Sequence, residues 1–101
     1  QRREQERQAD RARKEAERQK KQAEQEAKRA EARQAAQDEI NWLHSYIDRL
    51  SALYEQIETE LNNSSLTEYK RIQLQKQLLQ TEEKIHKNKV KLDKAYFTAN
   101  N

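Results

Sequence analysis

The residues with the clearest potential for chemistry are four lysines near the end of the sequence. They recur at intervals of three and four residues, which would place them along one stripe of a helix: Lys84, Lys87, Lys91 and Lys94. Ammonium groups in such a row can contact the phosphates of nucleic acid or of an anionic membrane surface. The alternative is a solvated face paired with acids on a facing helix, such as Glu31, Asp38 and Glu39. Because the stripe contains no arginine, the usual reader of bases and phosphates, the sequence favours the second interpretation.

Other groups that could support catalysis or metal binding lack the partners that such chemistry needs. Neither His44 nor His86 has a second histidine or a cysteine three or four residues away, which favours polar flanking roles over a metal site. The sequence contains no Gly and no Cys, and therefore no glycine-rich phosphate loop and no thiolate. Its serines and carboxylates are scattered. We therefore expect no enzymatic activity, no cofactor and no metal.

The composition indicates a helical chain rather than an ordinary globular domain. Charged residues make up 39 % of the 101 positions, and Gly, Pro, Cys and Met are absent. Ala, Glu, Lys, Arg, Gln and Leu dominate, and these residues are strong helix formers. No apolar run approaches the ~20 residues that cross a bilayer, so we expect no transmembrane segment. Since the chain begins with Gln1, we expect it to belong to a longer protein, and both the cytoplasm and a bacterial periplasm fit.

Residues 1–39 contain no large apolar side chain. Acids and bases alternate at helical neighbour spacing, and each such pair stabilises a helix by about 0.2–0.5 kcal/mol. The sequence therefore predicts an extended helix with little burial. This segment is similar in composition to the Ala/Lys/Glu/Gln/Arg-rich helical stalks of bacterial envelope-spanning and colicin-like proteins. The resemblance covers about two-fifths of the chain and implies a stalk, without assigning a role to any residue.

An unbroken apolar pattern begins abruptly where the charged segment ends. Its members alternate in steps of three and four residues, the repeat of a coiled-coil seam: Ile40, Leu43, Ile47, Leu50, Tyr54, Ile57 and Leu61. A break follows, where Asn62 and Asn63 can adopt the left-handed conformation that ends a helix. Ser65 and Glu68 match a capping box that begins a new helix. The sequence therefore predicts a turn at 62–65.

Residues 66–97 are expected to form a helix that returns along the first. Its apolar residues again follow a spacing of three and four, and four of them are predicted to lie in the interface: Leu74, Leu78, Ile85 and Leu92. Two positions of this seam, Thr81 and Asn88, are polar. A seam Asn typically fixes the register of paired helices at a cost in stability.

The predicted turn also implies a register for the two helices. Folding the chain there pairs residues whose numbers sum to about 127. This register places Leu43 near Ile85. It also sets residues 90–97 beside residues 30–37, where alanines provide small side chains for larger ones to pack against.

The predicted fold is all-α: a long N-terminal helix and an antiparallel return helix form a helical hairpin or coiled coil. Residues 1–29 are expected to be a charged helical extension, residues 30–97 the hairpin, and residues 98–101 a frayed tail. Two helices bury one seam and leave their outer faces exposed to solvent. A core this small is only marginally stable. We therefore expect the hairpin to oligomerise into a bundle.

Four apolar residues beside the seam are predicted to face a partner: Trp42, Tyr46, Leu53 and Leu79. The first hypothesis for function is a non-enzymatic stalk, spacer or assembly module that forms homo-oligomers or binds a helical protein partner. The second is a binding module whose lysine stripe contacts nucleic acid or anionic lipid. In the third, the hairpin is half of a hetero-oligomeric coiled coil, with Trp42, Tyr46 and Leu53 facing a different protein. The sequence favours the first hypothesis.

Overall fold

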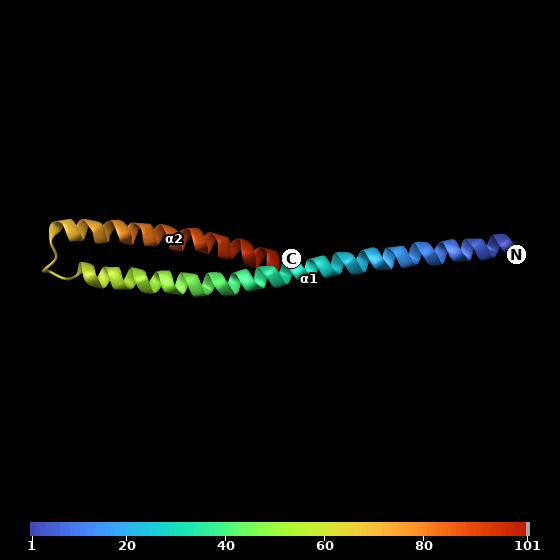
Figure 1. Cartoon of the computed structure of the whole chain (residues 1–101), viewed down its shortest axis with the longest axis horizontal. Helices are drawn as coiled ribbons and strands as arrows, with labels where there is room; N and C mark the ends of the chain where they lie inside the picture. Colours follow the sequence, from blue (N-terminus) through green and yellow to red (C-terminus); the bar gives the residue numbers. More distant parts are fainter. Residues whose placement is uncertain (101) are drawn as a thin grey trace.

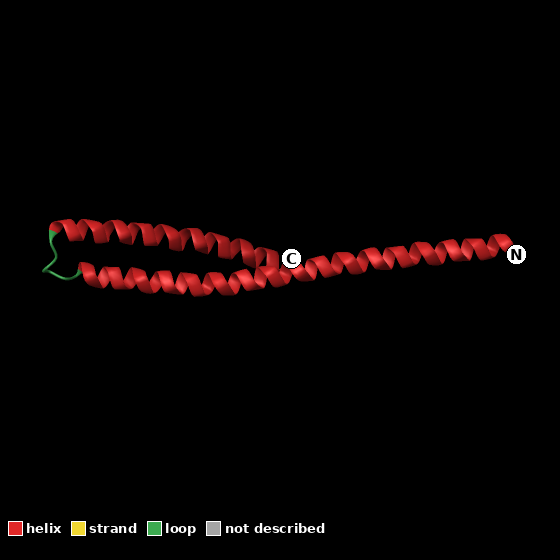
Figure 2. Cartoon of the chain, in the orientation of Figure 1, coloured by secondary structure: helices red, strands yellow, loops and turns green. Residues whose placement is uncertain are grey.

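The computed structural model describes residues 1–100 and shows two antiparallel helices (Figure 1). Helix α1 spans Arg2–Leu61 and helix α2 spans Glu68–Asn100, and no strand is present in this range. A single loop joins them at one end of the rod (Figure 2). The molecule measures 98 × 15 × 14 Å. The prediction of an all-helical hairpin is confirmed.

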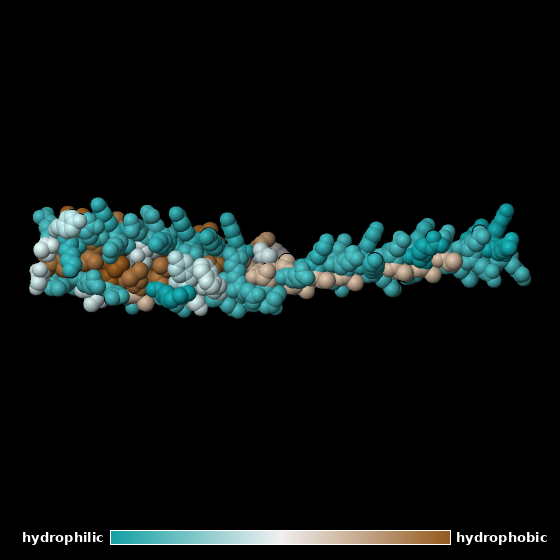
Figure 3. Space-filling view, viewed as in Figure 1, coloured by the Kyte–Doolittle hydropathy of each residue, from teal (hydrophilic) through white to brown (hydrophobic). Residues whose placement is uncertain are grey.

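The first half of α1 projects beyond the hairpin as a single helix (Figure 1). Every side chain from residue 1 to residue 35 is exposed, so tertiary packing does not stabilise this part. Strong helix formers, the absence of Gly and Pro, and continuity with the packed second half sustain the helix instead. Figure 3 shows a hydrophilic surface here, with a thin pale-brown row of small apolar side chains.

The hairpin buries one continuous seam between α1 and α2. Six residues of α1 and four residues of α2 are buried: Ala36, Ile40, Leu43, Ile47, Leu50 and Ile57, and Leu74, Thr81, Asn88 and Ala95. The remaining positions predicted for the interface are half-buried: Tyr54, Leu61, Leu78, Ile85 and Leu92. A seam without a third layer leaves its edges open, and brown apolar surface remains visible between the helices in Figure 3.

The register of the two helices differs from the predicted one. Ile40 and Leu43 form a buried cluster with Ala95, and Leu92 and Ala99 pack against it. The numbers of facing residues therefore sum to about 135 rather than about 127. The prediction that Leu43 lies near Ile85 is wrong by one heptad, and its neighbours are Leu92 and Ala95 instead.

The shift has two physical causes. If α2 is moved along α1 by seven residues, every seam position of α2 again faces the seam, so the apolar pattern by itself permits both registers. The loop then selects between them: it occupies residues 62–67, because α2 begins at Glu68 rather than at residue 66. Figure 1 shows the first turn of α2 lying beyond the last turn of α1. The helix also continues to Asn100 through part of the expected frayed tail, whereas residue 101 lies outside the described residues.

The loop uses other interactions than those predicted for it. Asn62 has φ −77°, and no residue of the described chain has a positive φ, so no left-handed residue ends α1. The Asn63 side-chain oxygen instead accepts a hydrogen bond from the Ser65 backbone N–H at 3.0 Å. Thr67, rather than Ser65, caps α2: its hydroxyl accepts the Lys70 N–H at 3.2 Å.

The loop is also tied to the helices by one long side chain. The Arg71 guanidinium donates to the carbonyl oxygens of Leu61 at 3.1 Å and of Asn63 at 3.4 Å. These carbonyls lie at and just beyond the end of α1, where helical hydrogen bonding stops and acceptors need a partner. Arg71 can serve them only because the first turn of α2 stands beyond the end of α1 (Figure 1).

The two polar residues of the seam satisfy their own hydrogen bonds. The Thr81 hydroxyl donates to the Gln77 carbonyl at 2.8 Å, and the Asn88 side-chain amide donates to the Lys84 carbonyl at 2.7 Å. Within residues 1–100, no buried side-chain nitrogen or oxygen lacks a hydrogen-bond partner. Both residues therefore sit in the seam without an unsatisfied polar atom, but each takes the place of a larger apolar contact.

Candidate interaction surfaces

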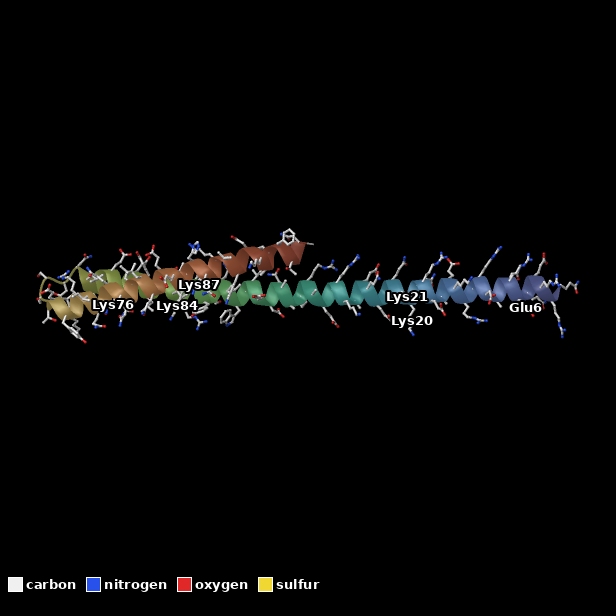
Figure 4. All side chains as sticks on the ribbon, turned by 90° about the horizontal axis from the view of Figure 1, so that it is seen from above. Glu6, Lys20, Lys21, Lys76, Lys84 and Lys87 are labelled. Atoms are coloured by element: carbon white, nitrogen blue, oxygen red, sulfur yellow. The ribbon has the colours of Figure 1, made fainter. Side chains whose placement is uncertain are left out.

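A groove on one side of the hairpin shows which side chains of α1 and α2 share that side. It is lined by Ala32, Ala35 and Glu39 of α1 and by Lys91, Lys94 and Thr98 of α2. Because a seven-residue step returns to nearly the same side of a helix, Lys84 and Lys87 continue the row of Lys91 and Lys94. The four predicted lysines thus lie together along one side of the hairpin. Figure 4 shows α2 crossing over α1 from above, with Lys84 and Lys87 following one another along α2.

The same step on α1 brings aromatic residues to this side. Trp42 follows Ala35 by seven positions, and Tyr46 follows Glu39 by seven. The rings of Trp42 and Tyr46 lie 5.0 Å apart between centroids, at an interplanar angle of 55°. Trp42 is 55 % exposed, and Leu53, seven residues beyond Tyr46, is 44 % exposed. Three of the four predicted partner residues therefore lie beside the lysine stripe.

We call this side of the hairpin the basic flank. Seven-residue steps from the groove residues and from Trp42 and Leu53 place six cations and two carboxylates on it: Arg49, Lys70, Lys84, Lys87, Lys91 and Lys94, with Glu39 and Glu60. Within residues 1–100, the one ion pair closer than 4.0 Å joins Arg13 to Asp10, on the projecting part of α1. The pairing of the stripe with Glu31, Asp38 and Glu39, which the sequence favoured, is therefore not formed. The four lysines of the stripe are exposed.

The opposite side of the hairpin is marked by a contact between His44 of α1 and Tyr96 of α2. The Tyr96 hydroxyl lies 2.6 Å from Nε2 of His44, and the rings meet edge to face at 5.9 Å. His44 thus has Tyr96 of α2 as a side-chain partner across the hairpin. Among residues 1–100, no group of three or more potential metal ligands is present.

We call the side that carries this contact the acidic flank. A seven-residue step returns to nearly the same side of a helix, so residues at such steps from His44 and Tyr96 share this side with them. Together with the adjoining positions toward the outer surface, they include six carboxylates and one lysine: Asp48, Glu55, Glu58, Glu68, Glu82, Asp93 and Lys89. A shallow groove along α2 is lined here by Leu79, Glu82, His86 and Lys89, and it extends across the outer surface of α2 to Glu83 and to Lys87 of the basic flank. Leu79 is 61 % exposed. The fourth predicted partner residue therefore lies on the flank opposite the other three.

The outer face of α2 carries apolar residues that the sequence analysis did not assign to a surface. Tyr69, Val90 and Phe97 are exposed, and Phe97 is 72 % exposed. Tyr69, Val90 and Phe97 are separated by multiples of seven residues, so they share one line of the helix facing away from α1. This second heptad series was the signal in the sequence that could have identified the surface.

Neither helix in the described range has an apolar stretch long enough to cross a membrane. No protein-family model matches the chain, and neither a curated protein nor a solved structure shows significant similarity to it.

Proposed function

We propose that the chain is a non-enzymatic structural module, in which the hairpin assembles with further helices and α1 acts as a stalk or spacer. One observation carries this proposal: the outer surface of the hairpin exposes eight large apolar side chains, whereas its seam buries six. Single exposed apolar residues are ordinary on protein surfaces. Here they repeat along helical lines on both flanks and on the outer face of α2, which is the pattern of helices that lack a partner.

The occupant favoured by this surface is another helix. The exposed apolar residues follow the seven-residue spacing by which helices pack against one another in coiled coils. A second copy of the chain would cover them in a homo-oligomeric bundle, and a different helical protein would do so in a hetero-oligomer. The rod shape suits such packing, because side-by-side helices bury surface along their whole length.

The projecting part of α1 supports the role of a spacer. It lies outside the hairpin, its side chains are exposed, and the face that Figure 3 shows is mostly hydrophilic. A helix of 60 residues is about 90 Å long at ~1.5 Å per residue, so α1 can hold apart whatever is attached at its two ends.

Sedimentation equilibrium over a wide range of protein concentration tests this function. We expect a mass above that of the monomer, and a substituted chain carrying Leu53→Gln, Leu79→Gln and Phe97→Gln should be monomeric with its helicity retained. A matched control carries Ala12→Gln, Ala16→Gln and Ala23→Gln on the projecting part of α1 and should assemble normally. Assembly that survives loss of the three exposed apolar residues would contradict the proposal.

A second candidate function is binding of a polyanion by the basic flank. The observation that favours it is the position of the lysine stripe beside Trp42 and Tyr46, with no ion pair to neutralise it. Lysines that neutralise phosphates, combined with aromatic rings on which bases stack, are the usual means of binding single-stranded nucleic acid. Anionic lipid headgroups would engage the same lysines without the rings.

Neutralising the stripe tests this second function. Replacing its four lysines with Gln should weaken the binding of a single-stranded oligonucleotide and reduce the slope of log affinity against log salt. A control with the same loss of charge replaces Lys14, Lys20, Lys21 and Lys28 on the projecting part of α1. Figure 4 shows Lys20 and Lys21 there, far from the hairpin. If both variants lose the same affinity for the oligonucleotide, binding depends on net charge alone and the lysine stripe is not a specific site.

A further inference from the structure

We propose that the basic flank of one copy of the chain receives the acidic flank of a second copy. This inference rests on the proposed assembly function and names the surfaces that meet. The sequence has a formal net charge of only +3. The fold nevertheless separates the charges of the hairpin: six cations and two carboxylates line the basic flank, and six carboxylates and one lysine line the acidic flank.

The charges of the two flanks lie at the same position along the hairpin. With facing numbers that sum to about 135, Lys84 and Lys94 lie level with residues 51 and 41 of α1. On the other flank, Glu82 and Asp93 lie level with residues 53 and 42. Two copies that lie side by side and point the same way therefore bring the lysines of one against the carboxylates of the other without sliding along the rod.

Apolar side chains on the two flanks give the contact a core. The basic flank offers Trp42 and Leu53, with the Tyr46 ring beside that of Trp42, and the acidic flank offers Ile72 and Leu79. Aromatic residues, Trp above all, often anchor protein interfaces when they fit into a pocket of the partner. Complementary charges around such a core mainly determine which surfaces meet and how fast they meet. The groove beside Leu79 is the surface that the Trp42 ring would meet.

Contacts between identical flanks are disfavoured by the same charges. A two-fold contact of two basic flanks would oppose two lysine stripes, and a two-fold contact of two acidic flanks would oppose two rows of carboxylates. The contact between unlike flanks leaves one basic and one acidic flank open at the ends of any chain of copies. Such a contact adds further copies until a ring closes. We therefore expect assemblies larger than a dimer.

Charge reversal on each flank separately tests this contact. The first variant reverses the stripe: Lys84→Glu, Lys87→Glu, Lys91→Glu and Lys94→Glu. The second variant reverses the opposite flank: Asp48→Lys, Glu55→Lys, Glu82→Lys and Asp93→Lys. Each variant alone presents two flanks of like charge, so its mass in sedimentation equilibrium should fall to that of the monomer. Mixing the two variants in equal amounts should restore the wild-type mass, because each reversed flank then meets an oppositely charged one.

A third variant controls for net charge. It carries Lys14→Glu, Lys20→Glu, Lys21→Glu and Lys28→Glu on the projecting part of α1, and its net charge equals that of the first variant. It should assemble like the wild type and should fail to restore the mass of the second variant. All substituted side chains are exposed, and circular dichroism checks that each variant remains helical. Neutral Lys→Gln and Glu→Gln versions, together with Asp→Asn, should weaken assembly without abolishing it.

The outcomes separate this inference from the function on which it rests. If the wild type assembles and neither flank variant changes its mass, the flank contact is wrong while the assembly function stands. If the wild type remains monomeric at every concentration, the contact between copies is wrong, and the assembly function is left only with a different helical protein as the partner. If the first variant loses binding to an oligonucleotide while the wild type stays monomeric, the stripe serves a nucleic acid and the contact between copies is overturned.

Discussion

Replacing Leu43 with Ala measures how much the single seam of the hairpin contributes to its stability. Leu43 is 1 % exposed and lies in the cluster formed with Ile40 and Ala95. The substitution removes three carbons, worth about 0.8 kcal/mol for each buried methylene. Leu-to-Ala changes in cores cost about 2–5 kcal/mol once the cavity is included. Because two helices without a third layer can close partly around the gap, we expect about 2–3 kcal/mol.

The matched control makes the same chemical change at an exposed position. Leu79 lies on the same hairpin but is 61 % exposed, so Leu79→Ala should cost less than about 0.5 kcal/mol in the monomer. Urea unfolding followed by circular dichroism at 222 nm, a wavelength at which α-helices have strong negative ellipticity, reports both values. The measurement is made at a protein concentration low enough for the chain to be monomeric, so that an interface between copies does not contribute.

A difference of less than about 1 kcal/mol between Leu43→Ala and Leu79→Ala would refute the reasoning. It would mean that the seam between α1 and α2 is not the main source of burial in the free chain. The helices would then be held by propensity alone, or the hairpin would form only when a partner binds.

Three further changes test the seam, the loop and the projecting helix. Asn88→Leu should raise the free energy of unfolding by about 1–2 kcal/mol, since it replaces a self-satisfied amide with apolar contact; a lower urea midpoint would contradict this. Arg71→Gln removes the donors to the Leu61 and Asn63 carbonyls and should cost about 0.5–1.5 kcal/mol in the same assay. Deleting residues 1–29, where no side chain is buried, should leave the unfolding midpoint of the hairpin unchanged in thermal melts; a clear fall would reveal contacts outside the hairpin.

Local signals were sufficient to predict the helices and the residues on their inner faces. The helix-forming composition without Gly and Pro predicted two long helices, because propensity and periodicity act over neighbouring residues. The three-four spacing predicted which side chains turn inward, among them Leu43, Leu50 and Leu74, and the structure places these in the seam. The break after Leu61 was also visible as a cluster of Asn and Ser.

The loop details were beyond the sequence because several residues there compete for the same role. Ser65 and Thr67 can both cap a helix. In the structure α2 begins at Glu68, so Thr67 stands directly before it and its hydroxyl accepts the Lys70 N–H. In the loop after α1, the Asn63 side chain accepts the Ser65 N–H, and no residue there adopts a left-handed conformation. With these interactions the loop spans residues 62–67, two residues more than the predicted turn at 62–65.

The sequence by itself determined that the chain is helical, where it turns and which line of side chains faces inward. Only the tertiary structure decided the register, because a heptad pattern is unchanged by a slide of seven residues, and the loop selects one of the equivalent alignments. It also decided the separation of charge. Lysines of α2 and the aromatic pair of α1 are far apart in sequence, and they share one flank only because α2 returns antiparallel on a particular side of α1.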